Sequence, residues 1–329
     1  MLDIKFIREN KDIVQAGAKK KCVEIDIGKL IMLDDERLKV LKEIEDLRAE
    51  VNKVSNDIVR DQDPAHRIQL IEEMRVVKED IKSKEEKLKG IMDEWQKVML
   101  LVPNIPDMSV PEGNSDQENK EIKIWGDKPT FSFEPKDHIE IMTTLKMADF
   151  ERGTKVHGFR GYFLTGEGAK LSFAIWNYAI DFFGARGFSL IVPPIVDRKE
   201  SFLGTGFLPQ GEEDLYKTQD GDYLAGTSEV PLMGLHGGEI LDKNSLPIRY
   251  LGFSPCFRRE AGSHGKDIKG LIRVHEFFKV EQVILCEASH EISVKMHEEI
   301  NRNTEEFIES LGIPYHTVIN CGGDLGLGQ

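Results

Sequence analysis

Apolar residues recur every seven positions in the first third of the chain, in two segments separated by a short polar break. In each segment two such series interleave, with Glu and Lys between them. This heptad spacing predicts coiled-coil helices over about residues 27–100. The positions, apolar except for Arg37 and Lys84, are Leu30, Arg37, Ile44, Val51 and Ile58 with Leu33, Val40, Leu47 and Val54, then Leu70, Val77, Lys84, Ile91 and Val98 with Met74, Ile81, Leu88 and Trp95.

The polar break between the two segments, Asp61–Ala65, contains Pro64. Proline cannot continue the first helix but can begin the second, so the break predicts two antiparallel helices. At 1.5 Å per residue their hairpin would be roughly 45–50 Å long. A hairpin of this kind is typical of an oligomerisation or spacer device, and its Lys-bearing helices also suit contact with a polyanion.

From about Lys120 the pattern changes to short pieces with strand and helix character. A helix is expected after Gly168, followed by a strand over 187–192 that ends at two prolines. Two further strands are expected over Tyr250–Phe257 and Gly270–Leu285, joined by a loop of Gly, Ser and Lys. Together these pieces predict a sheet flanked by helices.

Charged and aromatic residues follow the two strands of this hairpin at even spacing. Arg258 and Glu260 are two residues apart, and Arg273, Phe277 and Glu281 are four apart, so strand geometry would place each set on one face. Arginine binds phosphate oxygens, an aromatic ring can stack on a base, and a carboxylate can hold an ammonium or hydroxyl group. The pattern favours nucleotide-dependent activation of a small polar substrate. Charged pairs on a solvated hairpin are the alternative interpretation.

Thr227, Ser228 and Glu229 follow a short strand-like run and precede an apolar run. Thr-x-Glu at this place is equally a helix-capping motif. Glu229 could supply the negative charge that an ammonium group requires in a partly desolvated pocket. Both interpretations stay open on these residues alone.

Composition narrows the class of protein. The net charge is −14 over 329 residues, but the first 105 residues carry 21 Lys and Arg against 23 Asp and Glu, so this part is nearly neutral. The sequence contains no run of 18 apolar residues, so no membrane span is expected. The N-terminal segment lacks a signal-peptide pattern. Four scattered cysteines favour reduced thiols in a cytoplasm, and the nine histidines show no metal-binding spacing.

The run FRREAGSHGKDIKGLIRVHEFFKVEQ, at 257–282, resembles motif 2 of class II aminoacyl-tRNA synthetases, and its details resemble the seryl-tRNA synthetase family of the bacterial type. The run GTGFLPQGEEDLYKTQDGDYLAGTSEVPL resembles the same family nearly throughout. The resemblance implies an α+β fold: an N-terminal antiparallel coiled-coil hairpin, then a class II antiparallel sheet flanked by helices. We therefore expect a tRNA-binding arm over 1–105, a linker over 106–119 and a catalytic domain over 120–329.

The resemblance also implies the residues that bind substrates. Thr227, Ser228 and Glu229 would bind serine, with Thr227 and Glu229 on its ammonium group, and Glu281 would accept its hydroxyl. Arg258 and Glu260 would be catalytic, with Mg²⁺ as a further cofactor. The ATP-binding residues would be Arg258, Arg259, Glu260, Val274 and Phe277, with the ring of Phe277 on adenine.

Further expectations concern partners. By resemblance, the helix, strand and proline of 168–194 would build a homodimer interface, and the loop Gly262–Gly270 would meet the acceptor end of tRNA(Ser). The arm would hold the long variable arm of that tRNA, and the enzyme would be cytoplasmic. Candidate arm contacts are Lys39, Arg48, Lys53, Arg60 and Arg67.

One feature departs from the family pattern. Motif 3, with a second phosphate-binding Arg and a Mg²⁺-binding Glu, lies beyond Gln329 in the family, so we expect an incomplete catalytic domain with no identifiable metal ligands. The leading hypothesis is a serine–tRNA ligase. A catalytically inactive paralogue that keeps tRNA or dimer contacts, and a synthetase-like ligase that charges a carrier protein, are the alternatives.

Overall fold

The computed structural model describes residues 2–261 and 269–329, and its contacts divide the chain into two units. One unit contains the residues up to Lys120 together with Ile319–Gln329, and the other is Glu121–Val318. The domain limits expected at residues 105 and 119 remain a prediction.

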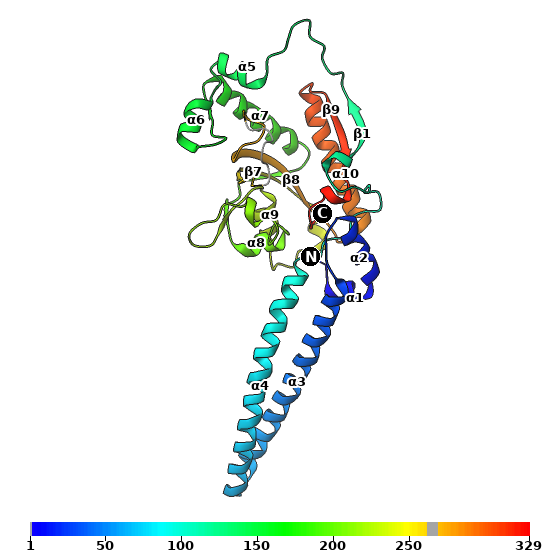
Figure 1. The fold of residues 1–329 in the computed structure, drawn as a ribbon, viewed down its shortest axis with the longest axis vertical. Helices are drawn as coiled ribbons and strands as arrows, with labels where there is room; N and C mark the ends of the chain where they lie inside the picture. The colour runs from blue at the N-terminus through cyan, green and yellow to red at the C-terminus, as the bar shows by residue number, and fades with distance from the viewer. Residues whose placement is uncertain (1, 262–268) are drawn as a thin grey trace. The chain divides into compact units, whose positions relative to one another are not determined.

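The N-terminal unit consists of two short helices followed by a long helical hairpin (Figure 1). The short helices are α1 (Ile4–Glu9) and α2 (Lys11–Lys20), and the hairpin is α3 (Ile27–Arg60) and α4 (Pro64–Met99). Pro64 opens α4, and the Asp63 side chain caps it by accepting a hydrogen bond from the Ala65 N–H. The predicted hairpin is therefore confirmed.

The heptad positions form the seam between α3 and α4. Val40, Ile44 and Ile91 are buried there, with Ile81 and Leu88 packed against them. A separate cluster at the base of the hairpin joins it to α1 and α2, and it consists of Ile7, Val14, Ile27, Leu30, Met99 and Val102. These two apolar clusters, one in the seam and one at the base, hold the hairpin together.

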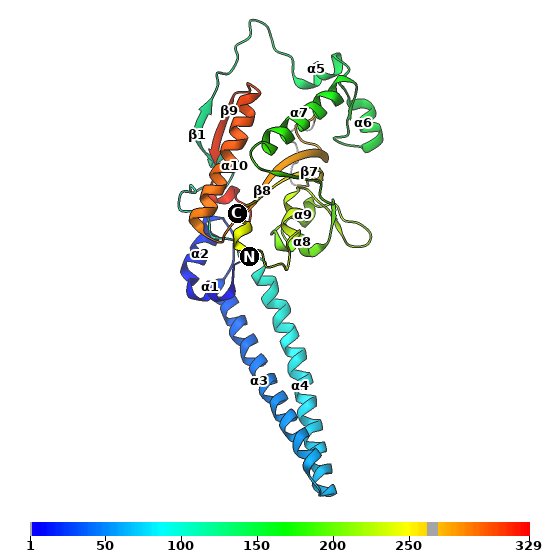
Figure 2. The ribbon, with the colours of Figure 1, turned by 180° about the vertical axis from the view of Figure 1, so that it is seen from behind.

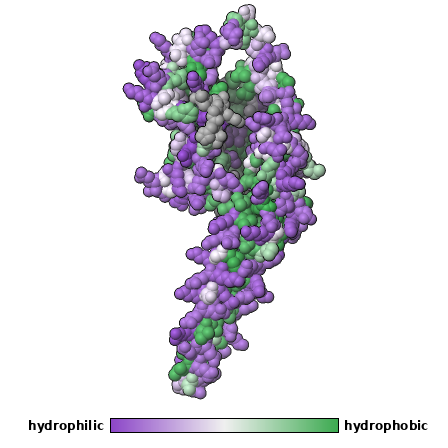
Figure 3. Space-filling view, in the orientation of Figure 1, coloured by the Kyte–Doolittle hydropathy of each residue, from purple (hydrophilic) through white to green (hydrophobic). Residues whose placement is uncertain are grey.

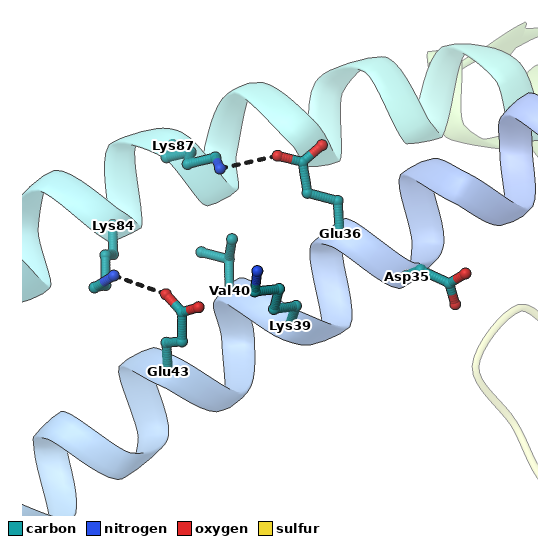
Figure 4. A pocket seen from close by; sticks show the side chains of 7 residues that line it. All are labelled: Asp35, Glu36, Lys39, Val40, Glu43, Lys84 and Lys87. Atoms are coloured by element: carbon teal, nitrogen blue, oxygen red, sulfur yellow. Dashed lines mark hydrogen bonds and ion pairs between the residues drawn. The ribbon is translucent and has the colours of Figure 1, made fainter.

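Ion pairs cross the hairpin beside the seam (Figure 4). Lys84 Nζ lies 2.7 Å from the Glu43 carboxylate, and Lys87 Nζ lies 2.9 Å from that of Glu36, with Val40 between the two pairs. Hydrophilic side chains make up most of the visible surface of the hairpin, interrupted by apolar ones (Figure 3). Exposed pairs of this type contribute little stability each, so the apolar seam dominates.

The second unit contains a three-stranded sheet in the order β4-β7-β8, of which Figure 2 labels β7 and β8. Strand β7 (Ile248–Phe257) pairs in parallel with β4 (Ser189–Ile191) and antiparallel with β8 (Glu276–Leu285). Helix α7 (Glu167–Gly184) packs on one face, where Trp176 contacts the rings of Phe253 and Phe278. Helix α7 and strand β4 confirm the helix and strand predicted from the sequence.

Helix α9 (Glu229–Gly234) packs on the opposite face of the sheet. A Cβ at Gly252 would lie 2.6 Å from the Cβ of Ser228, so only glycine allows the helix to approach β7 this closely.

The other strands form three pairs: β1 (Lys120–Trp125) with β9 (Tyr315–Ile319), β2 (Ala148–Asp149) with β3 (Phe163–Leu164), and β5 (Val196–Asp197) with β6 (Tyr223–Leu224). The other α-helices are α5 (His138–Thr144), α6 (Phe150–His157), α8 (Lys199–Gly204) and α10 (His290–Ser310).

No helix among the described residues is both long enough and apolar enough to cross a lipid bilayer.

Truncating a seam residue tests which interactions hold the hairpin. Ile44 is 2% exposed, so Ile44→Ala should lower the free energy of unfolding by about 2–4 kcal/mol. Met32→Ala, on the same helix but 72% exposed, should change it by less than about 0.5 kcal/mol. Urea unfolding followed by circular dichroism at 222 nm measures both free energies. Equal unfolding midpoints for the two variants would contradict the conclusion that the apolar seam stabilises the hairpin.

Candidate functional site

The candidate site lies on the face of β7 and β8 that carries α9. The antiparallel register pairs Gly252 with Glu281, Ser254 with Lys279, and Cys256 with Phe277. Because strand residues two apart share a face, Phe277, Lys279 and Glu281 point to the same side of β8. The sequence predicted this placement for Phe277 and Glu281.

A hydrogen-bonded cluster joins the Thr-Ser-Glu segment to β8. The Thr227 hydroxyl donates to the Glu281 carboxylate, with Oγ1 2.8 and 3.0 Å from its two oxygens. Lys279 Nζ donates to Thr227 Oγ1 at 2.7 Å and to Glu281 Oε1 at 2.9 Å. Thr227 and Glu281, two predicted serine-binding residues, are therefore in direct contact, and Lys279 is a third member that the sequence analysis did not single out.

Glu229 lies beside this cluster. Its backbone N–H donates to Glu281 Oε2 at 3.1 Å, while its side chain is exposed to solvent. Desolvation by the surrounding protein raises the pKa of the Glu229 carboxyl group, and the negative charge of Glu281 raises it further, whereas Lys279 lowers it. The site thus holds two carboxylates and one ammonium group within a small space, a setting that favours binding a further positive charge.

Ser228 has a different environment from its two neighbours. It is fully buried, and its hydroxyl lies 2.8 Å from the hydroxyl of Ser254 on β7. This contact fixes the start of α9 on the sheet. The Ser228 side chain therefore holds the segment against the sheet, and the role of Ser228 in binding serine remains a prediction.

Phe277 and Arg258 form the other half of the site. The Arg258 guanidinium carbon lies 5.4 Å from the centre of the Phe277 ring, and Nε donates to the carbonyl oxygen of Gly226 at 3.2 Å. The Ala225 carbonyl also accepts from the Phe257 N–H at 3.0 Å, so the chain before Thr227 runs along the end of β7. Here a cation and an aromatic face lie next to the Thr227–Glu281 cluster.

The strand argument for Arg258, Glu260 and Arg273 was wrong in its geometry. Strand β7 ends at Phe257 and β8 begins only at Glu276, so these three residues lie on the connecting chain. Glu260 has a left-handed backbone with φ +56°, which breaks the alternation of faces. The structure nevertheless joins two of them, because Arg273 Nη1 lies 2.6 Å from Glu260 Oε2.

The other two predicted ATP-binding residues differ in exposure. Arg259 is exposed, and its backbone N–H donates to the carbonyl oxygen of Asp214 at 2.8 Å. Val274 is 7% exposed and lies three residues before Phe277. Most of the loop Gly262–Gly270, which was expected to meet the acceptor end of tRNA, lies outside the described residues.

Two family models match separate parts of the chain. The seryl-tRNA synthetase N-terminal domain matches residues 1–106, and the tRNA synthetase class II core domain (G, H, P, S and T) matches residues 216–328. The serine–tRNA ligase of Thermodesulfovibrio yellowstonii is 44% identical over 331 aligned positions, which cover 99% of this chain and 78% of that protein. The chain belongs to the seryl-tRNA synthetase family.

Further relatives agree with this assignment. The serine–tRNA ligase of Deinococcus radiodurans is 40% identical over 100% of this chain and 77% of its own length. Among solved structures, the seryl-tRNA synthetase of Pyrococcus horikoshii complexed with ATP has a TM-score of 0.86 at 35% identity, covering 99% of this chain and 78% of that one. The cytoplasmic serine–tRNA ligase of Naegleria fowleri in complex with AMP has a TM-score of 0.83 at 32% identity, covering 99% and 77%.

The family assignment confirms three predictions: the seryl-tRNA synthetase family, the α+β fold with its helical hairpin, and an aminoacyl-tRNA ligase acting on serine. The roles of the individual residues, the homodimer, the Mg²⁺ ion and the cytoplasmic location remain predictions.

A buried acid lies on β5, the strand that pairs with the one leading into the Thr-Ser-Glu segment. Asp197 on β5 pairs with Tyr223 on β6, is 8% exposed, and has no hydrogen-bond partner for its buried Oδ2 atom among the described residues. Burial raises the pKa of the Asp197 carboxyl group from 3.8 to about 6. Because the folded state binds this proton more tightly than the unfolded chain, ionisation of Asp197 opposes folding as the pH rises through that range.

Asp197→Asn should remove this pH dependence. At pH 8 the variant should be more stable than the wild type by about 1–3 kcal/mol, and near pH 4 the difference should be small. Urea unfolding at several pH values measures the difference, with the exposed Asp127→Asn as the control. An unchanged pH dependence in Asp197→Asn would show that this carboxyl group does not carry the effect.

Proposed function

We propose that the face of β7 and β8 beside α9 activates serine with ATP. Thr227, Ser228, Glu229 and Glu281 bind serine in this proposal, and Arg258, Arg259, Glu260, Val274 and Phe277 bind ATP. The observation that carries it is the contact of Thr227, Lys279 and Glu281 immediately beside the Phe277–Arg258 pair. An amino-acid pocket and a nucleotide pocket then share one surface, as a reaction between the two substrates requires.

The chemistry of the cluster suits serine. Glu229 provides a negative charge for the ammonium group, and Glu281 accepts the side-chain hydroxyl. Alanine has no hydroxyl, so a carboxylate positioned for that hydrogen bond would lose an interaction with alanine. Threonine must be excluded by shape, which discriminates more weakly.

The chemistry of the Phe277–Arg258 pair suits a nucleotide. An aromatic ring can stack on adenine, and the planar guanidinium group can bind phosphate oxygens. The Pyrococcus horikoshii relative was solved with ATP, and the Naegleria fowleri relative with AMP, which supports ATP as the second substrate here. In the proposed reaction the serine carboxylate attacks the α-phosphorus and pyrophosphate leaves.

The serine carboxylate is already ionised at neutral pH, so this step needs neither a general base nor a covalent nucleophile. Positioning of the two substrates and neutralisation of phosphate charge by Arg258 supply the rate enhancement. The described residues contain no cluster of three or more His, Cys, Asp or Glu side chains fit to hold a metal ion. Mg²⁺ commonly binds nucleotide phosphates with few protein ligands, so we expect it to enter together with ATP.

The helical hairpin is proposed to bind tRNA(Ser). Arg48, one expected contact, forms an ion pair with Glu85 across the hairpin at 2.6 Å and so contributes to holding the two helices. Lys53 and Arg60 lie closer to the tip on α3 and are better candidates for phosphate contacts. The proposed division of the chain follows: arm 1–105, linker 106–119 and catalytic domain 120–329.

A homodimer is also proposed, through α7 and β4. Both elements carry large apolar side chains that are exposed in the single chain. Exposed apolar patches of this kind often mark protein–protein interfaces. These side chains are Leu171, Phe173 and Ile175 on α7, Leu190 on β4 and Val192 just after it. We expect the enzyme to act in the cytoplasm.

Removing the carboxylate of Glu281 tests the serine pocket. Glu281→Ala should lower serine-dependent ATP–pyrophosphate exchange by about ten- to a hundred-fold, because the substrate hydroxyl loses a charged acceptor. The preference for serine over alanine should narrow by a similar factor. Glu276→Ala, an exposed residue of the opposite face of β8, is the control and should keep both values. An unchanged serine-to-alanine ratio in Glu281→Ala would contradict the assignment.

Shortening the hairpin tests the proposed tRNA-binding role. Replacing residues 41–90 with a short glycine–serine linker removes the outer hairpin and keeps the apolar cluster at its base. Serine activation should be spared, while charging of tRNA(Ser) should fall by more than about a hundred-fold. For the intact chain, tRNA binding should weaken steeply with salt. Undiminished charging by the shortened protein would exclude this role.

A further inference from the structure

The chain that leads into β8 is held by residues more than a hundred positions earlier in the sequence. His138, the first residue of α5, accepts a hydrogen bond through Nε2 from the Leu271 N–H at 3.1 Å. The donor is a backbone amide, so Nε2 must be unprotonated and the ring proton must lie on Nδ1. The contact therefore depends on one tautomer of the His138 imidazole.

The residue before Leu271 is built to admit this ring. Gly270 has φ +82°, a backbone conformation that side chains rarely adopt. A Cβ on Gly270 would overlap His138 Nε2 and would lie 2.7 Å from Cε1. The sequence thus leaves space at position 270 that the imidazole of His138 fills.

Three more contacts hold the same stretch of chain. The His275 ring lies 5.9 Å from that of His157 and 6.3 Å from that of Phe159, centre to centre. The Tyr162 hydroxyl donates to the carbonyl oxygen of Glu276 at 3.1 Å. A tyrosine hydroxyl is protonated at neutral pH, and burial raises the pKa of Tyr162 further. The segment from α5 to β3 therefore fixes the chain at residues 271, 275 and 276.

The stretch held in this way carries the nucleotide half of the site. Arg273 pairs with Glu260, Val274 is buried, and Phe277 stands next to Arg258. Arg273, Val274 and Phe277 lie within seven positions of Gly270 along the chain. Glu260 and Arg258 contact Arg273 and Phe277, respectively. Residues 271–275 form a short, bent connection that enters β8 at Glu276, so a displacement of Leu271 would shift the residues that directly follow it.

We propose that His138 is a positioning residue for the ATP site, acting through the Leu271 amide and the space left by Gly270. His138 itself touches no substrate in this proposal. It sets the path of residues 271–277, and so the places of Arg273, Val274 and Phe277. The inference rests on the proposed binding of ATP by this face of the sheet.

The experiment compares His138→Ala with His138→Gln, whose side-chain oxygen can replace Nε2 as the acceptor. Two properties are measured on the intact chain: hydrogen exchange of the Leu271 amide, and the dissociation constant of ATP by calorimetry. His138→Ala should speed the exchange and raise the ATP dissociation constant by about three- to ten-fold, the effect of one hydrogen bond. His138→Gln should recover most of both.

Two further variants sharpen the test. Gly270→Ala should reproduce the effects of His138→Ala, and it should add less in the His138→Ala background, where no ring remains to be displaced. His316→Ala is the matched control, since His316 is an exposed histidine that pairs with Glu121 on the β1–β9 sheet. In the wild type, nitrogen NMR should find His138 with its proton on Nδ1.

The outcomes distinguish the positioning role of His138 from the proposed binding of ATP. Unchanged Leu271 exchange in His138→Ala, or a proton on Nε2 in the wild type, would overturn the inference. Faster exchange with an unchanged ATP dissociation constant would also overturn it, because the contact would then not serve the site. If the wild type itself binds no ATP, the proposed function fails, while exchange and tautomer still decide whether His138 holds Leu271.

Discussion

The antiparallel register of β7 and β8 is the constraint on which the site depends. It places Gly252 opposite Glu281 and so allows the start of α9 to approach the strand that carries the acid. A slip of one residue would exchange the two faces of β8 and bring Phe278 into the site. The register is enforced from the other side, where Trp176 of α7 packs on Phe253 and Phe278. The apolar face thereby determines which polar side chains meet on the functional one.

Periodic features of the sequence predicted much of this arrangement. The heptads and Pro64 predicted α3 and α4, because a repeat sustained over four heptads has few other solutions. Alternation on β8 placed Phe277 and Glu281 together. The same argument failed for Arg258 and Glu260, because β7 ends at Phe257 and alternation cannot predict the left-handed backbone of Glu260. Periodicity describes regular elements, and these residues lie just beyond one.

Two contacts were not predicted from the sequence. Lys279 joins Thr227 across 52 residues, and His138 joins Leu271 across 133. The alternation of Phe277, Lys279 and Glu281 could have pointed to Lys279. Nothing local marks His138, because the space that it fills is made by a glycine in a distant loop. Such contacts follow from tertiary packing and become visible only when the fold is known.

The charges of the site explain why it is arranged around a lysine. Burial raises the pKa of Glu229, the negative charge of Glu281 raises it further, and Lys279, which pairs with Glu281, offsets part of this effect. With all three groups ionised, the cluster carries one net negative charge. Thr227, Lys279 and the Glu229 amide already donate to the Glu281 carboxylate, whose two oxygens can accept one further hydrogen bond. The Glu229 carboxylate makes no comparable hydrogen bond within the described residues, so it is open to an ammonium group. A substrate that brings one ammonium group and one further hydroxyl donor would neutralise the cluster without disturbing the contacts that hold Thr227 to β8.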